Sequence, residues 1–386
     1  MSGSRREVPA PERFKVWVRA AGRCTLCGKD LLDDSLTKRV WRLGELAHIV
    51  GQLDTAGSPR GLADLNATER DMAQNLMLVC AGEHVEIDRA GATELMTVER
   101  LTKLKAEHEG WVHRLTGLEK ARGTAVVRVR GDVRGSAVEL TKATCAEAVI
   151  TCEDRFPEFP LAFDEYGIEI DLHGLPGEMA ADTGYWQAGM ARIDEVLAHK
   201  VHEAVRTGRV RHISVFAFAR LPLVVYLGAR LDDTTPVTIY ERHRRSQSWV
   251  WPAARSTVRF AVQLPQAPPS GTEAVVIVNV SGTVQTDKIP EPLRGLRRYV
   301  VAPVAATPST EVIDSLAALE AFRAAVRELF ATIESFDTGI ERLHVLAALP
   351  VSAAVTLGRA HTAHVDPRLA IYDRAAVGYT PALEIA

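Results

Sequence analysis

One stretch of the chain, residues 45–88, limits the possible folds more than any other, because apolar and turn-forming segments follow each other there in a fixed order. Residues 45–50 have the composition of a strand that ends at Gly51, and residues 75–79 form a second apolar segment. Between them lies a polar loop with glycine and proline near its middle. A helix is expected from Glu83 onward. This order predicts a strand–loop–strand–helix unit.

Four side chains with distinctive chemistry fall at informative places in this unit. His48 lies near the end of the first strand, Asn75 begins the second, Cys80 follows it, and His84 lies in the helix. A Cys-x-x-Cys pair precedes the unit at residues 24–27, on a turn flanked by glycine. Histidine and cysteine side chains at such spacings indicate metal chemistry.

The His–Asn–His order, bracketed by cysteines, resembles the HNH (ββα-metal) nucleases. Residues 75–80, followed by His84, Ile87 and Asp88, are similar to that family's ending NLxxLCxxxHxxID. The resemblance covers about the first 116 residues. We therefore expect an HNH endonuclease domain at residues 1–120.

The resemblance implies a metal-dependent endonuclease that hydrolyses phosphodiester bonds of double-stranded DNA. Such hydrolysis needs an activated water and a cation near the leaving oxygen. His48 is the expected general base, because an imidazole titrates near neutral pH, and His84 is the expected ligand of a divalent cation, Mg²⁺. Asp88, one helical turn after His84, is implied as a second ligand. Asn75 is expected to brace the loop that carries the base.

One departure from the family concerns the residue before the base. Many family members have aspartate or histidine there, whereas this chain has Ala47. The cation then loses one protein ligand, which either water or Glu45 on the same strand is expected to replace. Arg60, in the loop, is a candidate for contact with a DNA phosphate. The alternative is a ββα unit that only binds DNA or serves the structure.

Three cysteines are candidates for a structural zinc site. Cys24 and Cys27 lie on a tight turn, and Cys80 follows an apolar strand. A structural zinc ion usually has four ligands. The HNH family's usual fourth ligand is cysteine or histidine three residues after the third cysteine, and this chain has Glu83 there. A zinc site of these four residues and a small thiol-lined core without metal both fit the sequence.

Composition limits the rest of the interpretation. A chain of 386 residues is expected to hold two or three domains. The net charge of -3 gives no general basic excess, so it neither supports nor excludes DNA as a partner. No apolar run reaches membrane-spanning length, and residues 1–14 lack the apolar core of a signal peptide. Five cysteines, an odd number, suit a reducing cytoplasm better than a disulfide framework.

The remainder of the chain alternates strand-like and helical segments. A polar stretch at residues 117–123 marks the expected domain boundary, and residues 125–386 form the second part. Strands that alternate with long helices predict α/β layers.

A pattern within this second part occurs twice. His212 is followed by an apolar strand, Leu-Pro, Leu-Gly and Ile-Tyr-Glu-Arg, and His344 is followed by the same order ending in Ile-Tyr-Asp-Arg. In both copies the tyrosine, Tyr240 or Tyr372, comes 28 positions after the histidine. The repeat predicts a duplicated Rossmann-like half. The alternative is that two βαβ units share this order by chance.

The two copies resemble the SAVED domain, a fusion of two CARF-like halves that senses cyclic oligonucleotides. HNH followed by SAVED is the architecture of effector nucleases of bacterial cyclic-oligonucleotide (CBASS) anti-phage defence. The resemblance implies that a cyclic di- or trinucleotide binds residues 125–386 and drives assembly of a homo-oligomer that cleaves DNA. The predicted fold class is a multidomain α/β protein, with a ββα-metal domain followed by a duplicated Rossmann-like domain.

Candidate nucleotide-binding residues follow from general chemistry. Bases stack on aromatic side chains, and phosphates bind arginine or helix N-termini. Each candidate also fits an ordinary place in the core or on the surface. The candidates are Arg220, Arg244, Arg245, Trp249, Trp251, Tyr185, Trp186 and Ser281.

Other functions fit less of the chain. It has no GxxxxGK[ST], GxGxxG or GxSxG motif, so ATP hydrolysis, dinucleotide redox chemistry and serine-hydrolase chemistry lack support. Two alternatives stay open. One is a restriction-type HNH nuclease whose C-terminal domain reads modified DNA. The other is a non-catalytic nucleotide-binding regulator, which Ala47 and Glu83 favour.

Overall fold

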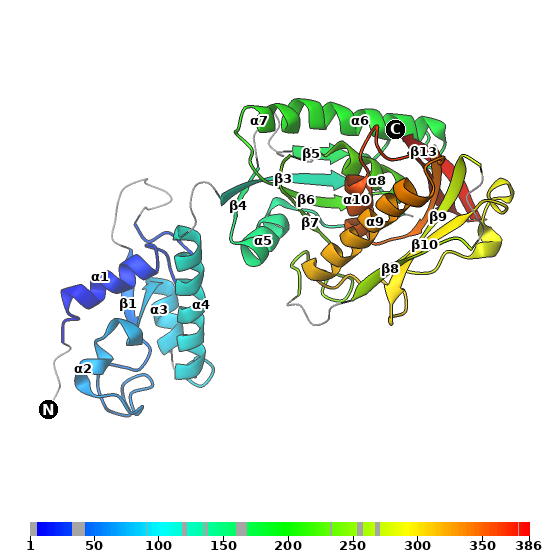
Figure 1. Ribbon diagram of the computed structural model, residues 1–386. Helices are drawn as coiled ribbons and strands as arrows, with labels where there is room; N and C mark the ends of the chain where they lie inside the picture. Colours follow the sequence, from blue (N-terminus) through cyan, green and yellow to red (C-terminus); the bar gives the residue numbers. More distant parts are fainter. Residues whose placement is uncertain are drawn as a thin grey trace. The chain divides into compact units, whose positions relative to one another are not determined.

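The structure, a computed structural model, divides into two compact units, residues 1–118 and residues 119–386 (Figure 1). None of the helices in the described part of the chain is long and apolar enough to cross a lipid bilayer. The described residues are 6–32, 43–89, 91–117, 122–133, 135, 138–159, 168–231, 234–252, 258–266, 271–376 and 378–386.

The first unit contains the expected strand–loop–strand–helix order. β1 (Gly44–His48) pairs antiparallel with β2 (Leu76–Cys80), which places His48 opposite Leu76. α3 (Ala81–Asp88) begins directly after β2. Two short elements in the connecting loop, α2 (Ala67–Arg70) and η1 (Ala73–Asn75), lead into β2.

Helices on both sides of β2 explain its sequence. The first four residues of β2 are all buried, because α1 (Ala10–Arg19) and α3 pack against it. A strand buried on both faces has a continuous apolar run and no alternation. The longest helix of the unit, α4 (Val98–Thr116), is capped by the Thr97 side chain at its N-terminus.

The described residues of the second unit form two sheets, and the first is parallel in every pair. Its order is β4-β3-β6-β7, and β5 also pairs with β3. Its strands are β3 (Gly123–Arg130), β4 (Phe156–Glu158), β5 (Ile168–Asp171), β6 (Ile213–Phe218) and β7 (Val237–Tyr240).

The second sheet has the order β13-β12-β11-β9-β10-β8. Its four central strands are parallel, and the two edge strands pair antiparallel. Its strands are β8 (Arg259–Gln263), β9 (Glu273–Asn279), β10 (Arg298–Val304), β11 (Arg342–Ala348), β12 (Arg368–Ala375) and β13 (Gly378–Ile385).

Helices connect most of the parallel strands, as is usual in α/β layers. The connection from β9 to β10 instead contains two short 3₁₀ turns, η4 (Thr286–Lys288) and η5 (Glu291–Leu293). The long helix at the top of Figure 1 includes a π-helical segment, Leu197–His202, between α6 and α7. The helices of the unit are α5 (Lys142–Glu153), α6 (Thr183–Val196), α7 (Glu203–Arg206), α8 (Leu221–Arg230), α9 (Leu316–Phe336) and α10 (Val351–Ala360).

The repeat predicted from the sequence corresponds to two βαβ units. The first is β6–α8–β7, in which the two strands pair in parallel, and the second is β11–α10–β12 with the same pairing. The two units meet through their helices, since α8 packs directly against α10. The repeated Leu-Gly pair lies at this crossing. A Cβ atom added at Gly228 would overlap the carbonyl oxygen of Val355, and one at Gly358 would overlap that of Val225.

We expect Gly228→Ala to destabilise the C-terminal unit by about 1–3 kcal/mol, because the backbones of α8 and α10 must move apart to accept a methyl group. Calorimetric unfolding of the full chain measures this change. The matched control is Gly295→Ala, where an added Cβ meets nothing within 4 Å. Equal unfolding temperatures for the two variants would show that the crossing tolerates separation.

Candidate functional site

His48, the last residue of β1, is held by a carboxylate. Its Nε2 lies 3.1 Å from Oδ1 of Asp71, and its side chain is 19% exposed. Gln52 donates to the same oxygen of Asp71 at 2.9 Å, and Arg6 lies 3.1 Å from the other. When Nε2–H is donated to Asp71, the neutral imidazole carries its lone pair on Nδ1. This pairing fixes the orientation of the ring. Sequence reasoning missed Asp71, which no local pattern distinguishes from other loop acids.

Asn75 is buried and fixes the segment that follows His48. Its Oδ1 accepts from the Val50 N–H at 2.8 Å, and its Nδ2 donates to the Val50 carbonyl at 2.8 Å. Nδ2 also donates to the Arg70 carbonyl at 2.9 Å. One amide side chain thus holds two loop segments together. This is the bracing position that the sequence predicts for Asn75.

His84 faces two carboxylates. Its Nδ1 lies 2.6 Å from Oε2 of Glu45 on β1, and its Nε2 lies 3.7 Å from Oδ2 of Asp88 on α3. Ala47, where many HNH proteins have a ligand, is fully buried. Of the two replacements expected there, Glu45 is the one whose carboxylate meets His84. One imidazole and two carboxylates therefore lie between β1 and α3.

Arg60 has a different place from the one expected. Its side chain is only 5% exposed, and its Nη2 lies 2.5 Å from Oδ1 of Asp88. It also donates to the carbonyl oxygens of Ile49 at 2.6 Å and Ile87 at 2.9 Å. The interpretation of Arg60 as a phosphate contact is wrong for this structure, because its donors are already bound inside the unit. Arg60 instead ties the end of β1 to the end of α3.

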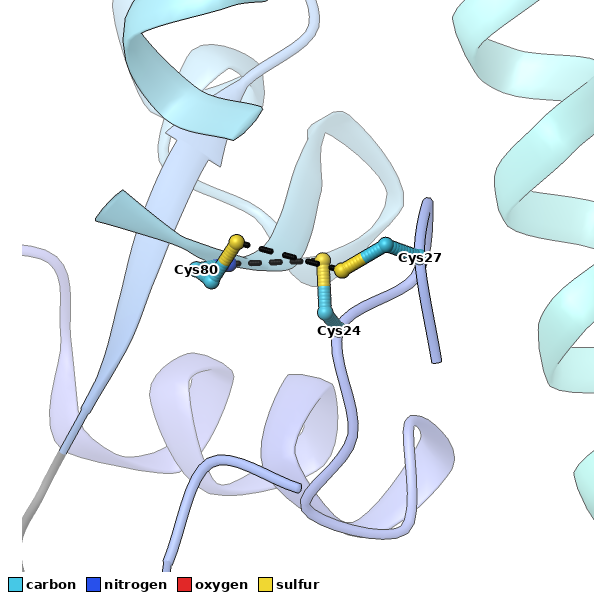
Figure 2. Close-up of side chains that lie close together, drawn as sticks. All are labelled: Cys24, Cys27 and Cys80. Atoms are coloured by element: carbon cyan, nitrogen blue, oxygen red, sulfur yellow. Dashed lines mark hydrogen bonds between the residues drawn. The ribbon is translucent and has the colours of Figure 1, made fainter. Parts of the chain in front are cut away.

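The three cysteines of the first unit form a cluster (Figure 2). The sulfur atoms of Cys24, Cys27 and Cys80 all lie within 4.8 Å of one another. Cys27 and Cys80 are 3.9 Å apart at sulfur, and the Cys80 N–H donates to the Cys24 sulfur at 3.3 Å. Among the described residues, no fourth histidine, cysteine or acid belongs to this group, so Glu83 is not brought into it.

Two opposing effects act on the pKa of the Cys24 thiol. Burial raises it, but backbone N–H groups of Cys27, Cys80 and Leu26 donate to the sulfur and bring the pKa below its ordinary value. Burial also raises the pKa of the Cys27 thiol to about 11, and the neighbouring Cys24 adds to this rise. Sulfur atoms that converge and accept N–H donors suit a soft cation such as zinc.

The two tryptophans expected to stack on a base lie in the core instead. Trp249 is 2% exposed and Trp251 is 7% exposed. The Nε1–H of Trp249 donates to the Glu139 carbonyl, and that of Trp251 donates to the Ile239 carbonyl, both at 3.3 Å. Each indole thus uses its one N–H donor in a hydrogen bond to a backbone carbonyl, and neither ring face is exposed to solvent.

The aromatic pair before α6 is also internal. Tyr185 and Trp186 are buried, and their rings meet edge to face at 4.9 Å between centroids. The guanidinium of Arg220 lies 5.7 Å from the centre of the Tyr185 ring. Tyr185 therefore packs beside Arg220, Trp186 packs against Tyr185, and neither ring is a stacking platform at the surface.

The remaining candidates lie at or near the surface of the second unit. Arg220 precedes α8 and lies 3.2 Å from Asp373 at the end of β12. Ser281 follows β9, and its N–H donates to the Ala348 carbonyl at 2.8 Å. Arg244 and Arg245 are exposed on a turn after β7. Arg220 and Ser281 thus lie at the ends of strands, whereas Trp249 and Trp251 are buried in the core.

In each repeat, one acidic side chain contacts the start of the helix in the other repeat. Glu241, directly after β7, accepts from the Ser352 N–H near the start of α10 at 2.8 Å. Asp373, the matching residue of the second copy, pairs with Arg220 at the start of α8. Burial raises the pKa of Glu241, although the Ser352 N–H opposes this effect. Sequence reasoning missed both contacts, whose only signal is the matched Tyr-Glu and Tyr-Asp pairs.

Comparison with known proteins bears on the second unit. Residues 193–385 match the family described as the SMODS-associated and fused to various effectors sensor domain, SAVED. No curated protein matches the chain.

Solved structures of Cap4 SAVED/CARF-domain containing receptors are similar to the chain. The receptor of Acinetobacter baumannii with the cyclic trinucleotide 3'3'3'-cAAA is 14% identical, with a TM-score of 0.44 over 77% of this chain and 66% of that one. The receptor of Moraxella osloensis is 14% identical, with a TM-score of 0.43 over 84% of this chain and 70% of that one. The chain thus spans 66% of the length of the Acinetobacter receptor. On the match of residues 193–385, which make up half of its length, this protein belongs to the SAVED family.

Proposed function

We propose that this protein is a DNA endonuclease, active when its C-terminal unit binds a cyclic oligonucleotide, and that it acts in the cytoplasm as an effector of anti-phage defence. The observations that carry the nuclease part are the pairing of His48 with Asp71 and, separately, the contacts of His84 with Glu45 and Asp88. The sensor part is supported by membership of a sensor-domain family.

His48 is the proposed general base. It takes a proton from the attacking water, and the Asp71 carboxylate, 3.1 Å away, stabilises the imidazolium that results. Asn75 contributes by holding the backbone of Val50, so that the segment after His48 cannot drift. Positioned groups of this kind favour hydrolysis because they need little reorganisation during the reaction.

His84 and Asp88 are the proposed ligands of a divalent cation, because the Nε2 of His84 and the Oδ2 of Asp88 are 3.7 Å apart. Glu45 lies at Nδ1 of the same ring and therefore orients the imidazole instead of sharing the ion. Carboxylates suit Mg²⁺, and an imidazole suits softer metals better. Arg60 holds one oxygen of Asp88 and leaves Oδ2 on the side of His84. When bound, the cation would stabilise negative charge on the phosphate.

The nucleotide is proposed to bind at the carboxyl ends of the parallel strands. In open α/β sheets ligands bind where neighbouring strands connect to opposite sides. Such points occur between β3 and β6 and between β9 and β11. Arg220 and Ser281 lie there, and Cap4 receptors, similar in fold, include one solved with a cyclic trinucleotide. Binding is proposed to favour a homo-oligomer that cleaves double-stranded DNA.

We expect His48→Ala to slow plasmid nicking about 10²–10⁴-fold, because a positioned general base contributes an effect of that size. The assay contains fresh protein, cyclic oligonucleotide, and Mg²⁺, Mn²⁺ or Ni²⁺ in parallel. His113→Ala, an exposed histidine on α4, is the matched control and should retain activity. Undiminished nicking by His48→Ala would exclude His48 as the base.

We expect cleavage by the wild-type chain to depend on a cyclic di- or trinucleotide, because gating requires a ligand that binds the active assembly more tightly than the free state. The same nucleotide should raise the unfolding temperature. A panel of cyclic nucleotides, tested by thermal shift and plasmid cleavage together, measures both. Equally fast cleavage without any nucleotide would favour a restriction-type nuclease that reads modified DNA.

A non-catalytic regulator is the second candidate, and specific contacts favour it. Glu45 and His84 are 2.6 Å apart, and Asp88 is 2.5 Å from Arg60, so these groups satisfy one another without a cation. A nucleotide that stabilises the chain while no metal supports nicking would establish this alternative.

Zinc bound by Cys24, Cys27 and Cys80 is a separate proposal, with Glu83 no longer included. Protein purified from zinc-supplemented cells should hold about one zinc per chain, since converging thiolates bind zinc tightly. We expect Cys80→Ser to lose that zinc and Cys152→Ser, in the other unit, to keep it. Elemental analysis by mass spectrometry measures the content. A wild-type chain without zinc would identify the cluster as a thiol-lined core.

A further inference from the structure

A small pocket opens in the second sheet between two segments distant in sequence. Its volume is about 80 Å³. One wall is the connection between β9 and β10, which contributes Thr283, Gln285 and Lys288. The other wall is the turn from β12 to β13, which contributes Arg374 and Tyr379 among others. Neither wall contains a residue used so far in the proposed nuclease or in the contacts between the repeats.

The wall that follows β9 is fixed by its neighbours. Val284 and Ile289 are buried in one apolar cluster, and the Val284 N–H donates to the Asn279 side chain at 2.8 Å. Thr283 and Gln285, on either side of Val284, are exposed. Burial of the residue between them therefore directs these two polar side chains outward, toward the pocket.

The opposite wall lies close to the first. Gly378 has a φ of +145°, and a Cβ atom added there would lie 3.0 Å from the Lys288 carbonyl oxygen. A larger residue at this position would push the two walls apart. Tyr379, the next residue, is buried in the same apolar cluster as Val284. Residues of both walls thus pack in the same apolar cluster, and this packing holds the two walls of the pocket in place.

The chemistry of the pocket selects for anions. Lys288 and Arg374 are cations, Thr283 offers a hydroxyl and Gln285 an amide, and none of the lining residues that the structure describes is acidic. One acid adjoins a lining residue on each wall: Asp287 precedes Lys288, and Asp373, which pairs with Arg220, precedes Arg374. At about 80 Å³, the pocket has room for an oxyanion group. Two cations and neutral donors around such a volume favour phosphate.

The pocket also lies where ligands of such sheets bind. Arg374 is near the carboxyl end of β12, and Thr283 follows the carboxyl end of β9. Both strands are parallel members of the same sheet. The carboxyl edge is the edge at which open α/β sheets hold their ligands.

We propose that this pocket is an oxyanion site that receives a phosphate group, and that the phosphate belongs to the nucleotide bound by the sensor. The second half of this statement rests on the function proposed above. The first half does not, because the pocket and its charges are independent of which nucleotide the protein senses.

Inorganic phosphate tests the site itself. At constant ionic strength, phosphate should raise the unfolding temperature of the full chain, because a ligand of the native state stabilises it. Arg374→Gln and, separately, Lys288→Gln should lose this shift. The matched control is Arg368→Gln, at the other end of the same strand, where Arg368 pairs with Glu384 at 3.5 Å. Equal shifts in the wild type and both pocket variants, or no shift in the wild type, would overturn the oxyanion site.

The cyclic nucleotide that stabilises the wild type tests the assignment to the sensor. Arg374→Gln should weaken its binding about tenfold, as expected for loss of one hydrogen bond to a charged group. Unchanged nucleotide affinity, with phosphate binding lost, would overturn the assignment and leave an independent oxyanion site. If no cyclic nucleotide binds the wild type, the proposed sensing function fails, and the phosphate experiment still decides the pocket.

Discussion

The contact on which the second unit most depends is the crossing of α8 and α10 at two glycines. Gly228 and Gly358 let the helix backbones touch, because any side chain there would overlap a carbonyl oxygen of the other helix. This closeness places the start of each helix beside the strand ends of the other repeat. Glu241 can then reach the Ser352 N–H, and Asp373 can reach Arg220. The carboxyl edges of the two sheets, where ligands of this fold class bind, are joined by these contacts.

In the first unit a buried guanidinium has the corresponding role. Arg60 donates to the carbonyl oxygens of Ile49 and Ile87 and pairs with Asp88. A buried charge is stable only when its hydrogen bonds are satisfied, so these partners constrain one another. Arg60 thus sets the distance between the strand that carries His48 and the helix that carries His84 and Asp88. Removal of this side chain would disturb the site while leaving both histidine side chains in the sequence, because Arg60 contacts only the backbone carbonyl oxygen of His48.

Sequence patterns predict local structure here better than they predict pairing across the fold. The strand at residues 75–79 and the repeated βαβ units follow from apolar runs and turn residues, and all are present. The predicted helix start at Glu83 lies two residues late, because α3 begins directly after β2 at Ala81. Asp71 lies 23 residues from His48, and no periodicity links the two. Trp249 and Trp251 were indistinguishable from exposed aromatics, since composition does not say which face of the turn packs inward.

The acidic residues at equivalent positions of the two repeats have different partners. In the first, Glu241 meets a backbone N–H, so its buried carboxylate has only neutral donors in that contact. In the second, Asp373 meets the guanidinium of Arg220, and the pair is neutral overall. Two identical subunits related by a two-fold axis would have to present the same contact twice. Two repeats within one chain have separate sequences, so the residues at the carboxyl edge of one repeat can differ from those of the other. A ligand that spans both edges therefore meets an acid at one helix start and an ion pair at the other, and even a ring of identical nucleotides would bind in an asymmetric environment.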